Sequence, residues 1–267
     1  MLEFYFVFDR VLKSYDNIFE AIEYEILRNY KNISKHFDFD ENGKEIKIFL
    51  KKLARSDRKK FNTLKQIPRK TGSVIINDLL SKNIIQIEKS REIKPKSTKH
   101  HKIKKELRHY QVQDKIHFKN NFTRFWFRFC EPNLELLDKN EFETVLNLIK
   151  QGFELYCSLP FELACMELLA KELNIQKELI TSYWDKENEI DIFVEFDGFT
   201  MVGEAKYKDR KICKNVLNIL QAKCKRSNLN PNLIALFSKS GFSNELLNLK
   251  NDKILLFEIN DFKDIYE

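Results

Sequence analysis

Two acids and a lysine flank a predicted tight turn in the C-terminal half of the chain. The stretch EIDIFVEFDGFTMVGEAKYK, residues 189–208, alternates apolar and polar residues on both sides of an Asp-Gly pair at 197–198. Asp-Gly between alternating hydrophobic residues favours a two-residue type I′ β-hairpin. Counting outward from this turn pairs Asp191 with Glu204, and Lys206 follows on the same face.

Like charges directly opposite each other destabilise a sheet, so this pair needs a physical reason. Two carboxylates at that spacing can share Mg²⁺ or Mn²⁺, because Mg²⁺ is held by one or two carboxylates and keeps waters. Such an ion lowers the pKa of bound water and stabilises charge on a phosphate. Lys206 would orient that water or neutralise the phosphate, and the main-chain carbonyl of Ala205 would complete the metal shell. The alternative is a surface cluster of ion pairs without catalysis.

The elements around this hairpin predict an α/β domain with a mixed sheet. Residues 141–173 read as two helices, with Pro160 in the first turn of the second. A helix at 214–226 and the apolar strands LIALFS and ILLFEI follow the hairpin. The alternation predicts that one hairpin face is apolar and that the other, more polar face carries the site. The apolar face would hold Ile190, Ile192, Val194, Phe196, Phe199, Met201, Gly203, Ala205 and Tyr207.

The sequence pattern of the N-terminal third predicts three short helices followed by an extended segment, which is the layout of a winged helix. The helix from Ser73 to Lys82 would be the recognition helix, and Ile84 to Lys94 the wing. A second interpretation is a small helical module that contacts protein. In the DNA-binding interpretation, four basic side chains would contact phosphates: Lys70, Lys82, Lys89 and Arg91.

The positive charge is concentrated in one part of the chain. The chain carries a net charge of +7, and from Gly43 to Arg128 there are 25 Lys and Arg against 7 Asp and Glu. A basic segment in an otherwise acidic chain indicates an anionic partner, here DNA, although a solvated basic face is the alternative. Residues 94–109 are predicted as a basic linker along the phosphate backbone through Lys102, Lys104 and Lys105.

Three stretches carry a resemblance to known families. FELACMELL, YWDKENEIDIFVEFDG and VGEAKYKDRKI together resemble the PD-(D/E)xK nuclease superfamily, with Ile-Asp in place of Pro-Asp. More narrowly, they resemble the C-terminal domain of a group of archaeal and bacterial ATPases, domain of unknown function family 234. The resemblance implies Glu162, Asp191, Glu204 and Ala205 as metal ligands. It also implies Asp191, Glu204 and Lys206 as catalytic residues, with Gln221 as a supporting residue.

This resemblance implies a Mg²⁺- or Mn²⁺-dependent endonuclease that hydrolyses DNA. Such nucleases often act as dimers because duplex cleavage needs two sites, so a homodimer and a monomer both stay open. The related proteins carry an ATPase domain. This sequence has no GxxxxGK followed by Ser or Thr, so we expect no nucleotide cofactor, and either the chain works alone or an ATPase partner is encoded separately. The alternative is a non-catalytic DNA-binding or partner-binding protein with a degenerate nuclease fold.

The expected fold class is α+β: an N-terminal helical and winged-helix region followed by a restriction-endonuclease-like α/β domain with a mixed central sheet. The predicted divisions are 1–93, a linker at 94–109, and 110–267, where an aromatic helical segment precedes a nuclease core at about 150–260. The sequence has no long apolar run, no basic leader and no CxxC pair, so we expect a cytoplasmic protein without a membrane span.

Overall fold

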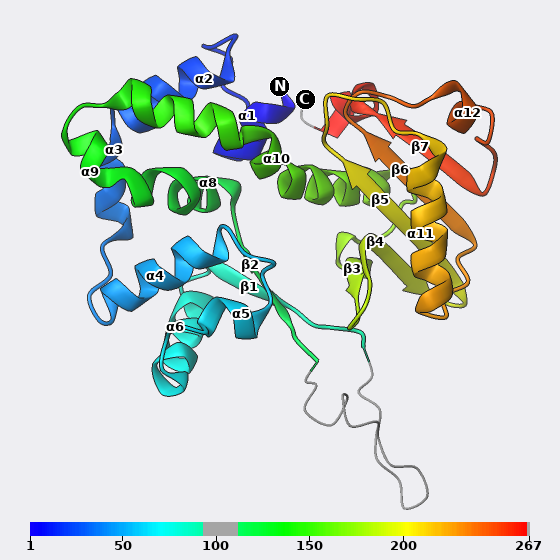
Figure 1. The fold of residues 1–267 in the computed structure, drawn as a ribbon, viewed down its shortest axis with the longest axis horizontal. Coiled ribbons are helices and arrows are strands. Elements are labelled where there is room, and N and C mark those ends of the chain that lie inside the picture. Colours follow the sequence, from blue (N-terminus) through cyan, green and yellow to red (C-terminus); the bar gives the residue numbers. More distant parts are fainter. Residues whose placement is uncertain (93–111, 266–267) are drawn as a thin grey trace, which may run out of the picture.

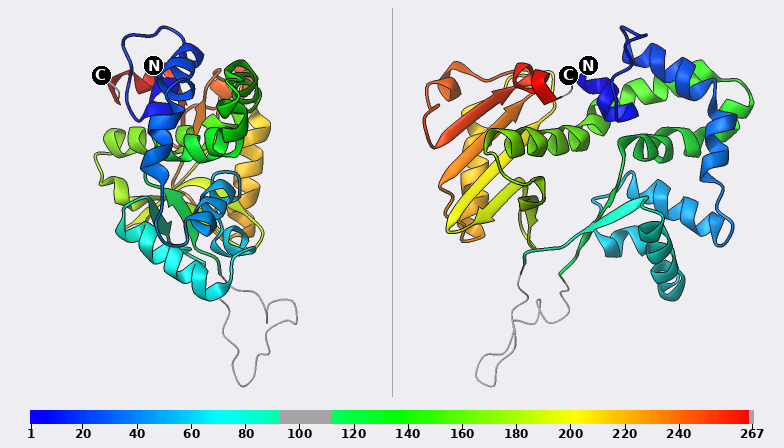
Figure 2. Two further views of the ribbon diagram at one scale, coloured as in Figure 1. Left: turned by 90° about the vertical axis from the view of Figure 1, so that its left-hand side faces the viewer. Right: turned by 180° about the vertical axis from the view of Figure 1, so that it is seen from behind.

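The computed structural model describes residues 1–92 and 112–265. A mostly helical half and a sheet half lie side by side, and one long helix, α10 (Phe142–Glu172), extends from the first into the second (Figure 1). Figure 2 shows α10 running between both halves from behind as well. None of the described helices is both long and apolar enough to cross a membrane.

The helical half is built from short elements packed on aromatic side chains. Phe125, Trp126 and Phe129 are buried and Phe122 packs against the same core, as their helical spacing predicts. The elements before α10 are α1 (Leu2–Phe8), α2 (Ile18–Ala21), the π-helix Ile22–Leu27, α3 (Tyr30–Ser34), the 3₁₀ helix Lys35–Phe37, α4 (Gly43–Leu53), α5 (Lys60–Leu64), α6 (Arg69–Ser81), β1 (Ile85–Glu88), β2 (Lys115–Phe118), α8 (Asn121–Phe125), the π-helix Trp126–Cys130, the 3₁₀ helix Glu131–Asn133 and α9 (Leu134–Asp138).

The helices α4, α5 and α6 are followed by an antiparallel pair, β1 and β2. This order matches the predicted layout, and the winged-helix assignment stays a prediction. Two details of the predicted layout were wrong. The helix begins at Arg69 rather than Ser73, whose hydroxyl donates to the Arg69 carbonyl inside the helix. The segment proposed as the wing supplies only one strand, β1. Its partner strand β2 comes after the predicted linker in the sequence, and that linker lies outside the described residues.

Helix α10 is continuous, although its sequence predicts two helices meeting at Pro160. Proline lacks the N–H that would bond to the carbonyl four residues earlier, which here belongs to Tyr156. The guanidinium of Arg124 donates to that carbonyl, with 3.1 Å between Nη1 and O, and lies over the Tyr156 ring. The helix therefore passes through Pro160 because a side chain from α8 replaces the missing donor.

The sheet half contains one mixed five-stranded sheet in the order β3-β4-β5-β6-β7. The first three strands pair antiparallel and the last three parallel, which confirms the predicted mixed sheet. Asp197 and Gly198 both have positive φ, at 45° and 79°, as a type I′ turn requires. The elements after α10 are the 3₁₀ helix Lys177–Leu179, β3 (Ile180–Trp184), β4 (Glu189–Phe196), β5 (Phe199–Lys206), α11 (Lys214–Arg226), β6 (Leu233–Ser238), α12 (Asn244–Leu247), β7 (Ile254–Glu258) and the 3₁₀ helix Ile259–Ile265.

Both faces of the hairpin are covered by helices, so neither is the polar surface that strict alternation predicts. Ile192 and Met201 pack in the main core with residues of α10, whereas Phe193 and Val202 pack with residues of α11. Ile190 was expected beside Ile192 but is buried on the α11 side. The register between β3 and β4 shifts at this point, and a bulge reverses the faces of the residues beyond it.

Tyr156 links three helices of the helical half, and its hydroxyl carries the first prediction. The buried hydroxyl donates to the Phe6 carbonyl at 2.7 Å and lies 3.0 Å from the Asn121 carbonyl. We expect Tyr156→Phe to lower the free energy of unfolding by about 1–2 kcal/mol, because these carbonyls lose their buried donor. Urea denaturation measures this change. Tyr24→Phe, at a side chain that is 52% exposed, is the matched control, and equal effects in the two variants would contradict the prediction.

Candidate active site

The hairpin brings Asp191, Glu204 and Lys206 together, as the residue count predicts. The ladder runs from Phe196 opposite Phe199 to Ile192 opposite Gly203, and it ends one pair short of the predicted pair of Asp191 with Glu204, where the pairing of β4 with β3 shifts. The Lys206 ammonium lies between these acids, with Nζ 2.7 Å from Glu204 Oε1 and 3.8 Å from Asp191 Oδ2. The amide of Ala205 also donates to Asp191 Oδ2, at 3.0 Å.

A second lysine completes the surroundings of Glu204. Lys223 on α11 donates to both oxygens of this buried carboxylate, at 2.9 and 3.2 Å. The sequence prediction named Gln221 on the same helix, but Gln221 is exposed while the buried face of α11 carries Leu217, Leu220 and Cys224. The helix therefore supports the site with a cation two residues beyond the predicted amide.

Glu162 approaches Asp191 from α10, on the opposite side of the sheet from Lys223. Its charge interacts with Asp191, whereas Asp191 interacts with both Glu162 and Glu204. The three acids thus stand in series, with Asp191 in the middle. Among residues 1–92 and 112–265, no three His, Cys, Asp or Glu side chains converge closely enough to hold a metal ion together.

Burial and mutual repulsion raise the pKa values of two acids in this series, Glu162 and Asp191. Burial, and then the charge of Asp191, raises the pKa of Glu162 to about 8, although Arg58 opposes the shift. Burial, and then the charge of Glu204, raises the pKa of Asp191 to about 6 against the effects of Lys206 and the Ala205 amide. Burial lowers the pKa of Lys206, but Asp191 and Glu204 outweigh it, so the net pKa is raised. Carboxyl groups with raised pKa values beside a charged lysine are typical of catalytic sites.

The donor set of Asp191 and Glu204 fits Mg²⁺ or Mn²⁺ in chemistry, because both ligands are carboxylates. Two carboxylates suffice for Mg²⁺ when waters and a substrate phosphate supply the remaining ligands. Glu162 stands apart as a third acid. The repulsion that the sequence predicts is neutralised here by two ammonium groups, Lys206 and Lys223.

Three of the predicted DNA contacts are paired with acids of the protein. Lys82 bonds Asp78 at 2.9 Å, Lys89 bonds Asp114 at 2.9 Å, and Arg91 lies 3.3 Å from Glu195. Lys70 is exposed on α6. The remaining predicted contacts, Lys102, Lys104 and Lys105, lie outside the described residues.

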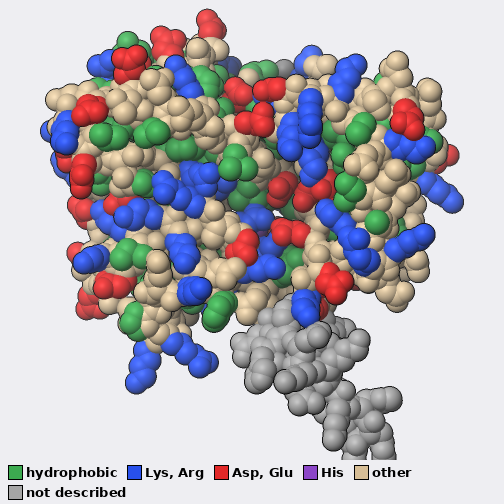
Figure 3. All heavy atoms as spheres, in the orientation of Figure 1, with side chains coloured by type: hydrophobic (Ala, Val, Ile, Leu, Met, Phe, Trp, Pro, Cys, Tyr) green, Lys and Arg blue, Asp and Glu red, His purple; other side chains and the backbone are tan. Residues whose placement is uncertain are grey.

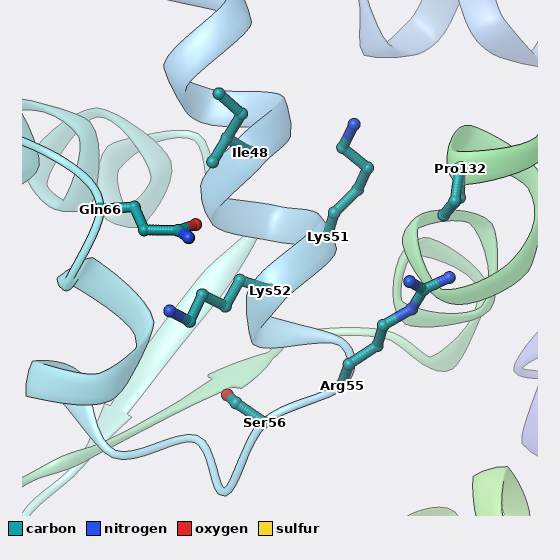
Figure 4. Close-up of a pocket in the computed structure, with 7 residues that line it drawn as sticks. All are labelled: Ile48, Lys51, Lys52, Arg55, Ser56, Gln66 and Pro132. Carbon is teal, nitrogen blue, oxygen red and sulfur yellow. The ribbon is translucent and has the colours of Figure 1, made fainter.

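A basic pocket that the sequence did not reveal lies at the C-terminal end of α4. Its volume is about 570 Å³, and its described lining contains three cations and no acid. Figure 4 shows Lys52 directed toward Gln66, and Arg55 toward Pro132 on the neighbouring segment. Arg55 also donates to the Arg128 carbonyl at 3.0 Å. The lining is Ile48, Lys51, Lys52, Arg55, Ser56, Gln66 and Pro132.

Three charged residues at the junction of the halves also escaped sequence reasoning. Lys115 is fully buried, and its Nζ lies 2.5 Å from Glu189 Oε1. Arg58 lies 3.8 Å from the same oxygen and 4.0 Å from Glu162 Oε2. Charged side chains of both signs surround this region in Figure 3. Since each partner is distant in sequence, only the folded chain brings them together.

Comparisons with known proteins support the narrower of the two predicted resemblances. Residues 126–218 match DUF234, described as archaeal and bacterial proteins of unknown function. The match includes Glu162, Asp191, Glu204 and Lys206, but not Arg58 or Lys223.

An uncharacterized protein of Methanocaldococcus jannaschii is 29% identical over 160 residues, which cover 55% of this chain and 35% of that protein. The chain thus aligns with about a third of this curated relative. No solved structure matches significantly.

Glu162 carries a prediction about pH and stability. A carboxyl group whose folded pKa lies above its unfolded value loses stability as pH rises between the two values, here from 4.5 to about 8. We expect Glu162→Gln to remove this loss, so that the variant gains about 1–2 kcal/mol on wild type between pH 5 and 8. Urea denaturation with a chelator present measures the difference.

The matched control is Glu154→Gln, at an exposed side chain on the same helix. Parallel stability curves for wild type and Glu162→Gln across this pH range would show that the carboxyl group does not hold its proton more tightly in the folded state.

Proposed function

We propose that this protein is a metal-dependent nuclease that hydrolyses phosphodiester bonds in DNA. The observation that carries the proposal is the meeting of Asp191, Glu204 and Lys206 on two adjacent strands, with Lys206 between the acids. Glu162 extends the group from α10. The PD-(D/E)xK resemblance of the sequence supports the same reading.

In this proposal Asp191 and Glu204 hold Mg²⁺ or Mn²⁺, which when bound activates water and stabilises negative charge on the phosphate. Lys206 carries a proton, and its ammonium lies where it can neutralise the phosphate. Glu162, whose raised pKa keeps it protonated near neutral pH, acts as a proton-holding group beside Asp191. Proton transfer by a positioned side chain contributes about 10²–10⁴-fold to such reactions.

DNA binding would use the basic pocket of α4. Phosphate contacts depend on cations that acids of the protein do not neutralise, and the described lining of this pocket contains no acid. The predicted contacts Lys82, Lys89 and Arg91 are paired with acids and would have to exchange partners. The pocket is therefore a better phosphate site than α6 and β1.

A second candidate function is non-catalytic binding of DNA or of a separately encoded ATPase. The observation that favours it is that both oxygens of Glu204 already accept hydrogen bonds from Lys223. A stable ion-pair cluster would hold α11 on the sheet without any metal. The two candidates differ in whether added metal produces cleavage.

A plasmid cleavage assay with Mn²⁺ separates them. We expect wild type to nick or linearise the plasmid, and Asp191→Ala and Lys206→Ala to lower the rate at least about 100-fold, since each removes a group at the reacting phosphate. Glu187→Ala, at an exposed acid in the turn before the strand of Asp191, is the control and should cut like wild type. Intact plasmid with every protein, together with persistent gel shifts, would favour the non-catalytic candidate.

The basic pocket carries a separate prediction about affinity. We expect the double variant Lys51→Gln, Lys52→Gln to weaken duplex DNA binding. Its slope of log affinity against log salt should also flatten by about 1.8, because each phosphate contact contributes about 0.9. Fluorescence anisotropy in EDTA measures both quantities. The double variant Lys250→Gln, Lys253→Gln makes the same charge change at exposed positions of the sheet half. Equal slopes in the two double variants would exclude the pocket as a phosphate site.

A further inference from the structure

A second cavity lies between the small sheet and α10, beside the candidate active site. Its volume is about 740 Å³, within the usual range of small-molecule sites of about 300–1,000 Å³. One wall belongs to the N-terminal half and is mainly basic and polar, with the acid Glu88. The other wall belongs to α10, β3 and the segment between them, and it combines apolar side chains with Glu162, Lys177 and Glu178. The lining includes Arg58, His117, Glu162, Leu163, Met166 and Ile180.

Two buried polar atoms of this lining have no partner. Arg58 Nη1 and His117 Nδ1 make no hydrogen bond to any residue within 1–92 or 112–265. A buried donor or acceptor left unsatisfied costs about 1–3 kcal/mol, so such atoms in native structures call for an explanation. His117 Nε2 pairs with Glu88 at 2.8 Å, which leaves Nδ1 as the free atom of a ring that is only 7% exposed.

The backbone at Arg58 is strained. Its φ is 66°, in the left-handed region that non-glycine residues seldom adopt. The Ile116 amide donates to the Arg58 carbonyl at 2.9 Å, and the Arg58 amide donates to Ser56 Oγ at 3.2 Å. Strain of this kind persists where surrounding contacts enforce it, and it gathers at binding sites. Here the contacts with β2 enforce the conformation of Arg58.

The charge of Arg58 is only loosely paired. Its Nη2 atom lies 4.0 Å from Glu162 and 3.8 Å from Glu189, whereas Lys115 already bonds Glu189 at 2.5 Å. Arg58 therefore has a planar guanidinium suited to a phosphate, which Arg binds through paired N–H donors.

We propose that this cavity holds one nucleotide unit of the DNA strand next to the cleaved bond, with Arg58 donating to its phosphate. The inference rests on the proposed function, since Glu162 lines this cavity and interacts with Asp191. Leu163, Met166 and Ile180 supply an apolar wall for the sugar and base. Burial lowers the pKa of His117, and with the Nε2 proton donated to Glu88, the neutral ring offers Nδ1 as an acceptor to a base N–H.

The test is calorimetric titration of the full chain with the single-stranded hexamer (dT)₆ in EDTA, at several salt concentrations. We expect Arg58→Gln to weaken binding by about 10-fold or more. Its salt slope should fall by about 0.7, the contribution of one phosphate contact on a single strand. Arg58→Lys should recover the slope but only part of the affinity. Arg210→Gln makes the same charge change at an exposed loop residue and should bind like wild type.

A second variant tests the opposite wall without changing charge. Leu163→Trp fills the cavity from α10 and should weaken (dT)₆ binding while leaving the salt slope unchanged. If Arg58→Gln does not fold, this variant by itself tests whether the cavity binds (dT)₆. Absence of (dT)₆ binding by wild type, or wild-type affinity in both variants, would overturn the inference. Arg58-dependent binding without metal-dependent cleavage would overturn only the proposed nuclease function. Cleavage by wild type with unaltered binding by Arg58→Gln would overturn only the inference.

Discussion

The ion pair between the buried ammonium of Lys115 and the half-exposed carboxylate of Glu189 is the interaction on which the arrangement of the two halves depends. The Lys115 ammonium is fully buried at the start of β2, and it also lies over the Trp184 ring, 4.4 Å from its centroid. A buried ammonium without its carboxylate would cost several kcal/mol. Glu189, the first residue of β4, must therefore lie next to Lys115. Asp191 follows Glu189 by two residues, and its place in the molecule is set by the same contact.

From this pair, a row of charged side chains continues through the centre of the molecule, and two of its acids, Glu162 and Asp191, are neighbours. Arg58 lies near Glu189 and Glu162, Glu162 interacts with Asp191, and Lys206 joins Asp191 to Glu204. Burial, and then the charge of the neighbouring acid, raises the pKa of Glu162 to about 8 and that of Asp191 to about 6. Because these groups interact, they titrate as a coupled set rather than independently.

The hairpin, its turn and the strands β6 and β7 follow from sequence patterns that act over short distances. Asp197-Gly198 sets the turn, and the turn sets the register as far as Ile192 opposite Gly203, next to Asp191 and Glu204. Strands β2 and β3 were not predicted, because each is short and its partner is remote or shifted by a bulge. The continuity of α10 also escaped prediction, since it depends on Arg124 reaching the carbonyl that Pro160 leaves free.

The sequence by itself determined which acids and which lysine would share one end of a hairpin, because register propagates residue by residue from a two-residue turn. It could not determine what lies above and below them. Lys223, Arg58 and Lys115 reach the site from other elements, and Gln221 is exposed. The pKa values of Glu162 and Asp191 depend on how deeply these side chains are buried, and that burial exists only once the two halves pack together. Tertiary structure alone therefore decided the charge state and the partners of the site.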